Sequence, residues 1–305
     1  MNNLVAIVGP TGTGKTRLAI RLAQAFNGEI VSADSRQVYR YMDIGTAKPS
    51  AEELSRVPHH LINIINPDED FSLSQYQYLA YKAINDIQQR SQLPLLVGGS
   101  GLYVWSLLEG WSIPRVPPDA EFRRSLQIKA AQLGSEELYK DLVKVDPVAA
   151  QEIDPRNVRR VIRALEVLKY TGTPFSQLRQ KKPPSFSTLI IGLTADRAEL
   201  YRHIDRRVDE MIERGLIDEV KKLVDMGNGL DLPSMSGIGY KQIGQFLKGD
   251  LSLESAVLQV KHETHRFVRH QYSWFRLRDS RIKWFDIQKE VEPEVTALVA
   301  AFISD

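Results

Sequence analysis

Cysteine is absent from this sequence of 305 residues. Structural disulfides, a thiolate nucleophile and cysteine-ligated zinc are therefore excluded. Long apolar runs are also missing, since none approaches the ~20 residues needed to span a bilayer. A strand-like segment begins at Leu4 without the basic region and apolar stretch of a secretory signal. We therefore expect a cytoplasmic protein that does not associate with membranes.

A strong charge of either sign is lacking as well. The chain has 40 Lys and Arg against 38 Asp and Glu, a net charge of +2, so the total says little about binding partners. Hydrophobic residues make up 43% of the chain, which excludes a mostly disordered protein. At roughly 150 residues per domain, the length favours about two domains.

Short apolar runs rich in Val and Ile predict the strands of a buried sheet. They cover residues 4–8, 29–33, 61–65, 94–97 and 188–193, with a weaker edge strand at 283–287. Continuous apolar runs that alternate with helical spacing favour a parallel sheet covered on both faces. Helices are expected over residues 196–227 and 252–276. The predicted fold class is α/β.

The middle of the chain has a different character. Proline-rich segments at 114–118 and 181–184 flank a stretch with helical spacing and no strand-like run. We predict an all-helical insertion at 116–183 in a core formed by 1–115 and 184–305. The insertion has 13 basic and 9 acidic residues, a net charge of +4. Its arginines at 156, 159, 160 and 163 share a helix face, which fits either a binding surface or a solvated face.

The strongest motif is Gly9-Pro-Thr-Gly-Thr-Gly-Lys-Thr16, which matches GxxxxGK[ST] between a predicted strand and a predicted helix. Its glycines let the backbone approach a ligand, and its N–H groups and the helix N-terminus attract phosphate. Lys15 would neutralise phosphate charge, and the Thr16 hydroxyl would bind Mg²⁺. The predicted phosphate-binding residues are Gly9, Thr11, Gly12, Thr13, Gly14, Lys15 and Thr16. The fold class is therefore P-loop-like.

A hydrolytic P-loop enzyme usually holds Mg²⁺ with an acidic residue at the end of a later apolar strand. The strand predicted at 94–97 continues into Gly98-Gly-Ser-Gly101 without Asp or Glu. This absence indicates a diphosphate held as a leaving group.

Asp34 follows the second predicted strand, within Ser32-Ala-Asp-Ser-Arg-Gln-Val-Tyr39. Ligands of open parallel sheets bind at the carboxyl ends of the strands, beside the P-loop. Asp34 could accept a proton there, hold Mg²⁺ through water, or cap the next helix.

Taken together, the motifs resemble those of the tRNA dimethylallyltransferase family. The resemblance spans nearly the whole chain: the P-loop, 32–49, 58–62, 95–103, 146–167, 237–242 and 264–276, in that order. The family moves a dimethylallyl group from dimethylallyl diphosphate to the exocyclic amine of the adenosine on the 3′ side of the anticodon. The resemblance implies Mg²⁺ as cofactor, a tRNA anticodon stem-loop as partner, and no obligate protein partner, so we expect a monomer.

The resemblance also implies roles for particular residues. Asp34 would orient and deprotonate the amine, Arg207 rather than Arg206 would reach the diphosphate, and Ser100 stands where the family commonly has Thr. The catalytic residues would thus be Asp34, Ser100 and Arg207. The residues implied in tRNA binding are Asp34, Ser35, Arg36, Gln37, Ser100, Arg123, Arg156, Arg159, Arg160, Arg163, Gly239, Tyr240, Lys241, Gln242, Arg266 and Arg269.

The C-terminal part of the core carries a second basic segment. Residues 259–283 contain seven Lys and Arg against two acidic residues, interleaved with aromatic residues such as Phe267 and Trp274. This pattern is typical of surfaces that bind phosphates and unstacked bases. It also fits an amphipathic helix whose aromatic side chains pack in the core and whose cations face solvent. His59 and His60 are not predicted to form a metal site by themselves, because adjacent residues of an extended segment face opposite sides. They are predicted to lead into the strand that begins at Leu61.

Three other functions remain compatible with parts of the sequence. A prenyltransferase acting on free AMP or ADP would share the P-loop and Asp34 but would need the basic segments less. A small-metabolite kinase would explain the P-loop but not the ordered motifs. An RNA-binding switch with a nucleotide in the P-loop would bind RNA without catalysis.

Overall fold

The computed structural model describes residues 2–114 and 116–304. The chain divides into two compact units, Met1–Leu108 with Ser185–Asp305, and Glu109–Pro184. The insertion predicted at 116–183 lies inside the second unit. None of the helices in the described ranges has the length and apolar character needed to cross a membrane.

The first unit is built on a parallel sheet, which confirms the α/β fold class. In the part of the chain that is described, the sheet has six strands in the order β3-β2-β4-β1-β5-β6, and every pair is parallel. The strands are β1 (Asn3–Val8), β2 (Gly28–Ser32), β3 (His59–His60), β4 (Leu93–Gly98), β5 (Ser187–Thr194) and β6 (Ile282–Asp286). The central strands are buried along nearly their whole length, as their continuous apolar runs predicted.

The strand predicted at 61–65 is wrong. In this part of the chain only His59 and His60 pair with β2, as the short strand β3. The chain then leaves the sheet, because Leu61 and Asn63 adopt left-handed backbone conformations with φ of 64° and 56°. The apolar side chains are still used, since Leu61 is buried and Ile64 packs in a hydrophobic cluster. The apolar run therefore indicated burial rather than strand structure.

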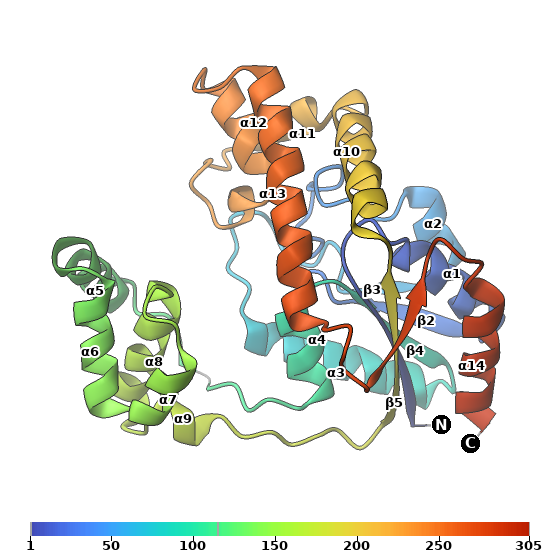
Figure 1. The fold of residues 1–305 in the computed structure, drawn as a ribbon, viewed down its shortest axis with the longest axis horizontal. Coiled ribbons are helices and arrows are strands. Elements are labelled where there is room, and N and C mark those ends of the chain that lie inside the picture. The colour runs from blue at the N-terminus through green and yellow to red at the C-terminus, as the bar shows by residue number, and fades with distance from the viewer. Residues whose placement is uncertain (1, 115, 305) are drawn as a thin grey trace. The chain divides into compact units, whose positions relative to one another are not determined.

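Helices cover both faces of the sheet (Figure 1). On one face, α1 (Lys15–Ala25) and α14 (Glu292–Ser304) share a hydrophobic cluster with β1, β4 and β5. On the other, α3 (Leu73–Gln89) contacts β2 and β4 and packs beside α4 (Gly101–Leu108). The short α2 (Ala51–Arg56) begins with a capping box formed by Ser50 and Glu53.

Further helices lie beyond the carboxyl ends of the strands (Figure 1). They are α10 (Arg197–Glu213), α11 (Leu216–Asp225), the 3₁₀ turn Ser234–Ser236, α12 (Tyr240–Leu247) and α13 (Leu253–Trp274). Leu200, Ile204 and Val208 of α10 pack against Val260 and Val268 of α13. These helices enclose the end of the sheet where the sequence places its functional motifs.

The second unit consists of α5 (Ala120–Leu133), α6 (Ser135–Val145), α7 (Pro147–Glu152), α8 (Val158–Thr171) and α9 (Phe175–Leu178). Leu138, Leu142, Val161 and Ile162 form its core. The fully buried carboxylate of Glu166 bonds both Arg123 and Arg163 and accepts the N–H of Asp119 at 2.8 Å. Breaking such a buried pair leaves an uncompensated charge, so Glu166 anchors α5 to α8.

Candidate functional site

The loop between β1 and α1 has the conformation that its glycines predict. Gly9, Gly12 and Gly14 have φ of 132°, 86° and 76°, values that side chains rarely adopt. At Gly9 an added Cβ would also lie 2.3 Å from the Leu193 carbonyl oxygen. α1 begins at Lys15 with no side-chain cap. The first N–H groups of a helix have no intrahelical partner, so this end of α1 can bind an anion.

Lys15 and Arg207 bring two cations to this loop. The Lys15 amino group donates to the Pro10 carbonyl at 2.7 Å, and an Arg207 N–H donates to the Thr11 hydroxyl at 3.4 Å. Burial lowers the pKa of Lys15 to about 7, against the opposing effect of the Asp34 carboxylate, and Arg207 lowers it further. Burial also lowers the pKa of Arg207. A phosphate group would stabilise two cations that the fold has partly removed from water.

This electrostatic cost leads to a stability prediction. The pKa of Lys15 falls from 10.5 to about 7 on folding, so between these values the unfolded chain binds more protons than the folded protein. The cost of the buried cation is complete below pH 7 and is relieved as the pH rises toward 10.5. We expect Lys15→Met to raise the melting temperature of the ligand-free protein, and to do so more at pH 6 than at pH 9. Equal shifts at both pH values in calorimetric scans would contradict this explanation.

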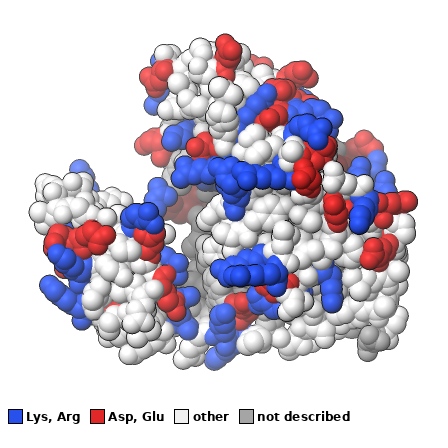
Figure 2. Space-filling model, in the orientation of Figure 1, with Lys and Arg blue, Asp and Glu red and all other residues white. Residues whose placement is uncertain are grey.

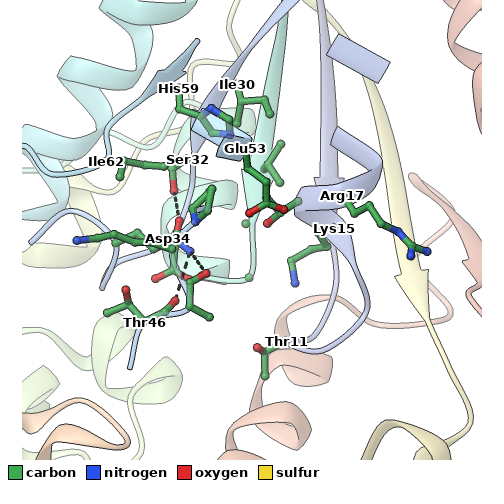
Figure 3. Close-up of a pocket in the computed structure, with 18 of the residues that line it drawn as sticks. Thr11, Lys15, Arg17, Ile30, Ser32, Asp34, Thr46, Glu53, His59 and Ile62 are labelled. Carbon is green, nitrogen blue, oxygen red and sulfur yellow. Dashed lines mark hydrogen bonds between the residues drawn. The ribbon is translucent and has the colours of Figure 1, made fainter. Parts of the chain in front are cut away.

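Asp34 faces the P-loop from the carboxyl end of β2. Its Oδ1 accepts the N–H of Arg36 at 2.8 Å. Figure 3 shows Thr11 and Lys15 on one side of a cavity of about 290 Å³, with Asp34 and Thr46 on the other. Thr16 and Arg207 line the same cavity. The structure therefore brings together a carboxylate, two cations, a hydroxyl and an open helix N-terminus.

Ser100 lies beside this cavity, in the loop between β4 and α4. Its hydroxyl accepts the N–H of Ser35 at 3.0 Å and lies 3.3 Å from the Ser35 hydroxyl. The β2 and β4 ends approach closely, because a Cβ on Gly98 would lie 2.1 Å from the Ala33 carbonyl oxygen. Ser100 thus fixes the backbone that follows Asp34.

Arg36 and Gln37 hold neighbouring loops. The Arg36 guanidinium donates to the Pro233 carbonyl at 2.8 Å, and the Gln37 amide donates to the Thr46 and Ala47 carbonyls at 3.4 and 3.3 Å. These bonds connect the Asp34 segment to the loop before α12 and to the loop that carries Lys48. Gln37 still lines the cavity, whereas Arg36 is not among its lining residues.

The Gly239–Gln242 turn faces inward. Tyr240 is buried and donates to Glu219 at 2.6 Å, while Gln242 is buried and accepts the N–H of Gly239 at 3.0 Å. The Glu219 carboxylate also accepts the N–H groups of residues 43, 44 and 45 at 2.9, 2.7 and 3.1 Å. Glu219 therefore joins two motifs that the sequence shows only as separate segments. Lys241, in contrast, is exposed.

The arginines of the second unit divide into two groups. Arg123 and Arg163 bond Glu166, and Arg163 also donates to the Val116 and Pro114 carbonyls. Arg156 precedes α8 and bonds Asp154. Arg159 and Arg160 are exposed on α8. The predicted stripe is therefore only partly a free cationic face.

Lys and Arg side chains gather on the first unit over α10 and α13 (Figure 2). Arg266 and Arg269 are exposed on α13, and Arg269 donates to the Tyr201 hydroxyl at 2.9 Å. Phe267 is also exposed between them. The inward face of α13 carries Gln271, a buried residue that contacts the P-loop and that the sequence analysis did not single out.

Metal-binding clusters of three or more His, Asp or Glu do not occur among the residues that the structure describes. His59 is bonded to the Val57 carbonyl at 2.8 Å, and His60 to Glu29 at 2.6 Å. The side-chain oxygen groups that line the cavity include the Thr16 hydroxyl and the carboxylates of Asp34 and Glu53. Mg²⁺ takes few protein ligands and several from phosphate and water, so this donor set fits it only together with a phosphate-bearing ligand.

Comparisons of the chain with known proteins agree on one family. The model of the IPP transferase family matches residues 37–278. The chain is 49% identical over 302 residues to a tRNA dimethylallyltransferase from Dehalococcoides mccartyi, covering 99% of this chain and 93% of that protein. It is 54% identical over 273 residues to one from Roseiflexus sp. (strain RS-1), covering 90% of each.

Solved structures agree in fold. A tRNA isopentenylpyrophosphate transferase from Bacillus halodurans is 43% identical, with a TM-score of 0.73 and coverage of 99% of this chain and 96% of that one. A eukaryotic dimethylallyltransferase acting on tRNA is 28% identical, with a TM-score of 0.87 and coverage of 100% and 80%.

Proposed function

The chain belongs to the tRNA dimethylallyltransferase family, and from this premise we propose how its own residues carry out the transfer. The reaction moves a dimethylallyl group from dimethylallyl diphosphate to the exocyclic amine of the adenosine on the 3′ side of the tRNA anticodon. The nitrogen–carbon bond forms, the carbon–oxygen bond to diphosphate breaks, and the amine loses one proton. The observation that best supports this proposal is that Lys15, Thr16, Arg207 and Asp34 line the same cavity.

The P-loop would hold the diphosphate. Lys15 and Arg207 line the cavity and would lie where negative charge grows as the carbon–oxygen bond breaks. Preorganised cations stabilise such charge without reorganisation. β4 (Leu93–Gly98) supplies no carboxylate at its end, which fits a leaving group better than a hydrolysed nucleotide. The Thr16 hydroxyl would bind Mg²⁺ together with diphosphate oxygens, and the ion would share the charge of the leaving group.

Asp34 would orient the amine and take its proton. The lone pair of an exocyclic adenine amine is delocalised into the ring, so alignment of this weak nucleophile matters at least as much as basicity. The bond from the Arg36 N–H to Oδ1 holds the carboxylate in place and leaves Oδ2 for the substrate. Ser100 would hold the backbone beside the adenosine, the acceptor of the prenyl group, through its contact with Ser35.

The exposed arginines would bind tRNA. Arg159 and Arg160 on α8, and Arg266 and Arg269 on α13, are exposed and would contact phosphates. Phosphate contacts give affinity that falls with salt, whereas the cavity gives selectivity for adenine. The adenine would leave its stack to reach Asp34. Tyr240 and Gln242 are buried and do not line the cavity, so they would support it from within the protein. The protein would function as a monomer.

The proposal is tested by incubating the protein with dimethylallyl diphosphate, Mg²⁺ and unmodified tRNA, followed by mass analysis of the nucleosides. We expect one adenosine of tRNA to gain the prenyl mass, and AMP to remain unmodified. Prenylated AMP with inert tRNA would instead favour a free-nucleotide prenyltransferase. Transfer to neither acceptor would overturn the proposal, and ATP consumption with a small metabolite would then favour a kinase.

A further inference from the structure

Gln271 connects two loops that meet at the cavity. It lies near the C-terminal end of α13 and is 3% exposed. Its Oε1 accepts the N–H of Thr11 at 2.9 Å, and its Nε2 donates to the Gly99 carbonyl at 3.1 Å. Both ends of one amide side chain are therefore used, one on the phosphate-binding loop and the other on the loop that carries Ser100.

The second of these loops is shaped to receive α13. A Cβ on Gly99 would lie 2.2 Å from the Gln271 Nε2, and a Cβ on Gly101 would lie 2.2 Å from the Trp274 ring. Glycine at these two positions lets the helix approach the backbone on both sides of Ser100. Since Gln271 and Trp274 are three residues apart, they lie on the same face of α13.

On the phosphate side, Thr11 is held twice. Gln271 takes its N–H, and Arg207 donates to its hydroxyl at 3.4 Å. Thr11 precedes the residues that open α1, so this bond leaves the N–H groups at the start of the helix for a phosphate. Gln271 therefore fixes the loop without competing for its ligand.

The opposite side of the same helix segment faces solvent, where Arg266, Arg269 and His270 are exposed. α13 therefore joins a cationic surface to both loops of the cavity within about two turns of helix.

We propose that Gln271 is a positioning residue for prenyl transfer. It sets the spacing between the phosphate-binding loop and the Ser100 loop, and it ties that spacing to the helix that holds the RNA. The inference rests on the proposed function. An amide does not titrate and gives up no atoms in the reaction, so its effect is on geometry alone. A misplacement of about 1 Å between reacting groups can cost ~100-fold in rate.

The test uses the whole chain with Gln271→Met, which keeps the length of the side chain and removes both hydrogen bonds. Gln271→Glu keeps an acceptor for the Thr11 N–H but places a carboxylate against the Gly99 carbonyl. Gln259→Met, on the exposed surface of the same helix, is the matched control. Single-turnover rates at saturating donor and tRNA are compared with tRNA dissociation constants, donor KM and melting temperatures.

We expect both Gln271 variants to lose on the order of 10- to 100-fold in single-turnover rate. Their tRNA affinity and donor KM should stay within about threefold of wild type, because only a geometry needed in the transition state has been lost. A wild-type rate in Gln271→Met would overturn the inference. So would an equal loss of rate in the control, or an unchanged rate at saturating substrates with weaker binding of tRNA or donor. Absence of transfer by the wild-type chain would overturn the proposed function, and the inference with it.

Discussion

Asp34→Asn should slow turnover strongly while both substrates remain bound. The substitution keeps the size of the side chain, and the amide oxygen can still accept the Arg36 N–H that Oδ1 accepts at 2.8 Å. What would be lost is the proposed proton acceptor and the negative charge that would align the amine. A positioned base typically contributes ~10²- to 10⁴-fold in rate, and we expect a loss in that range.

The measurement is single-turnover prenyl transfer, with tRNA binding followed separately by filter retention. Asp209→Asn is the control, since it removes a carboxylate that is exposed on α10 and bonded to Lys261. Retention of full turnover by Asp34→Asn would contradict the role of proton acceptor. Loss of tRNA binding in the same variant would instead assign Asp34 to RNA recognition. A nucleotide-dependent RNA-binding switch would transfer no prenyl group, so Asp34→Asn would change no rate in it. Binding of tRNA by Asp34→Asn without turnover would therefore favour an enzyme over a switch.

Much of the fold follows from local patterns. The central strands are apolar throughout because helices cover both of their faces, so residues 4–8, 94–97 and 188–193 were recognisable. The same signal failed at 61–65, where a loop with two left-handed residues buries Leu61, and Ile64 and Ile65 in part. Burial and strand geometry produce the same apolar run, and only pairing with β2 distinguishes them.

The phosphate side of the site was predictable because one continuous motif contains the strand end, the glycines and the helix start. Its partners come from far along the chain. Gln271 reaches Thr11 across 260 residues, and Glu219 reaches the N–H of Ile44 across 175. No spacing rule relates such positions, so their contacts appear only in the folded structure.

The spacing of the arginines predicted a larger exposed cationic surface than the structure has. The spacing of Arg163 with Arg156 and Arg159 indicated a shared face, but the buried Glu166 takes Arg163 together with Arg123. A sequence shows which side chains share a helix face. It does not show which of them a buried carboxylate will neutralise, as Glu166, three residues further along the same helix, does for Arg163.

Lys15→Met should weaken donor binding strongly. The Lys15 amino group lines the same cavity as Arg207 and the open start of α1. It donates to the Pro10 carbonyl, a neutral acceptor that binds a cation less strongly than a diphosphate would. Removing one partner of a buried charge pair costs about 2–5 kcal/mol. That range corresponds to roughly 30- to 4,000-fold in affinity for dimethylallyl diphosphate. Affinity for tRNA should not change, because the cation contacts the donor.

The pH dependence of donor binding identifies the lysine as the cause. The pKa of Lys15 is about 7 in the ligand-free site, and a bound diphosphate favours its charged form. Above pH 7, binding must therefore take up a proton, so the affinity of the wild-type protein should fall as the pH rises. Titration calorimetry with inorganic diphosphate in buffers of different ionisation enthalpy measures this uptake. The uptake should be smaller in Lys15→Met than in the wild type, and unchanged in Lys82→Met, whose lysine is exposed on α3. Equal proton uptake by wild type and Lys15→Met would assign the proton to another group.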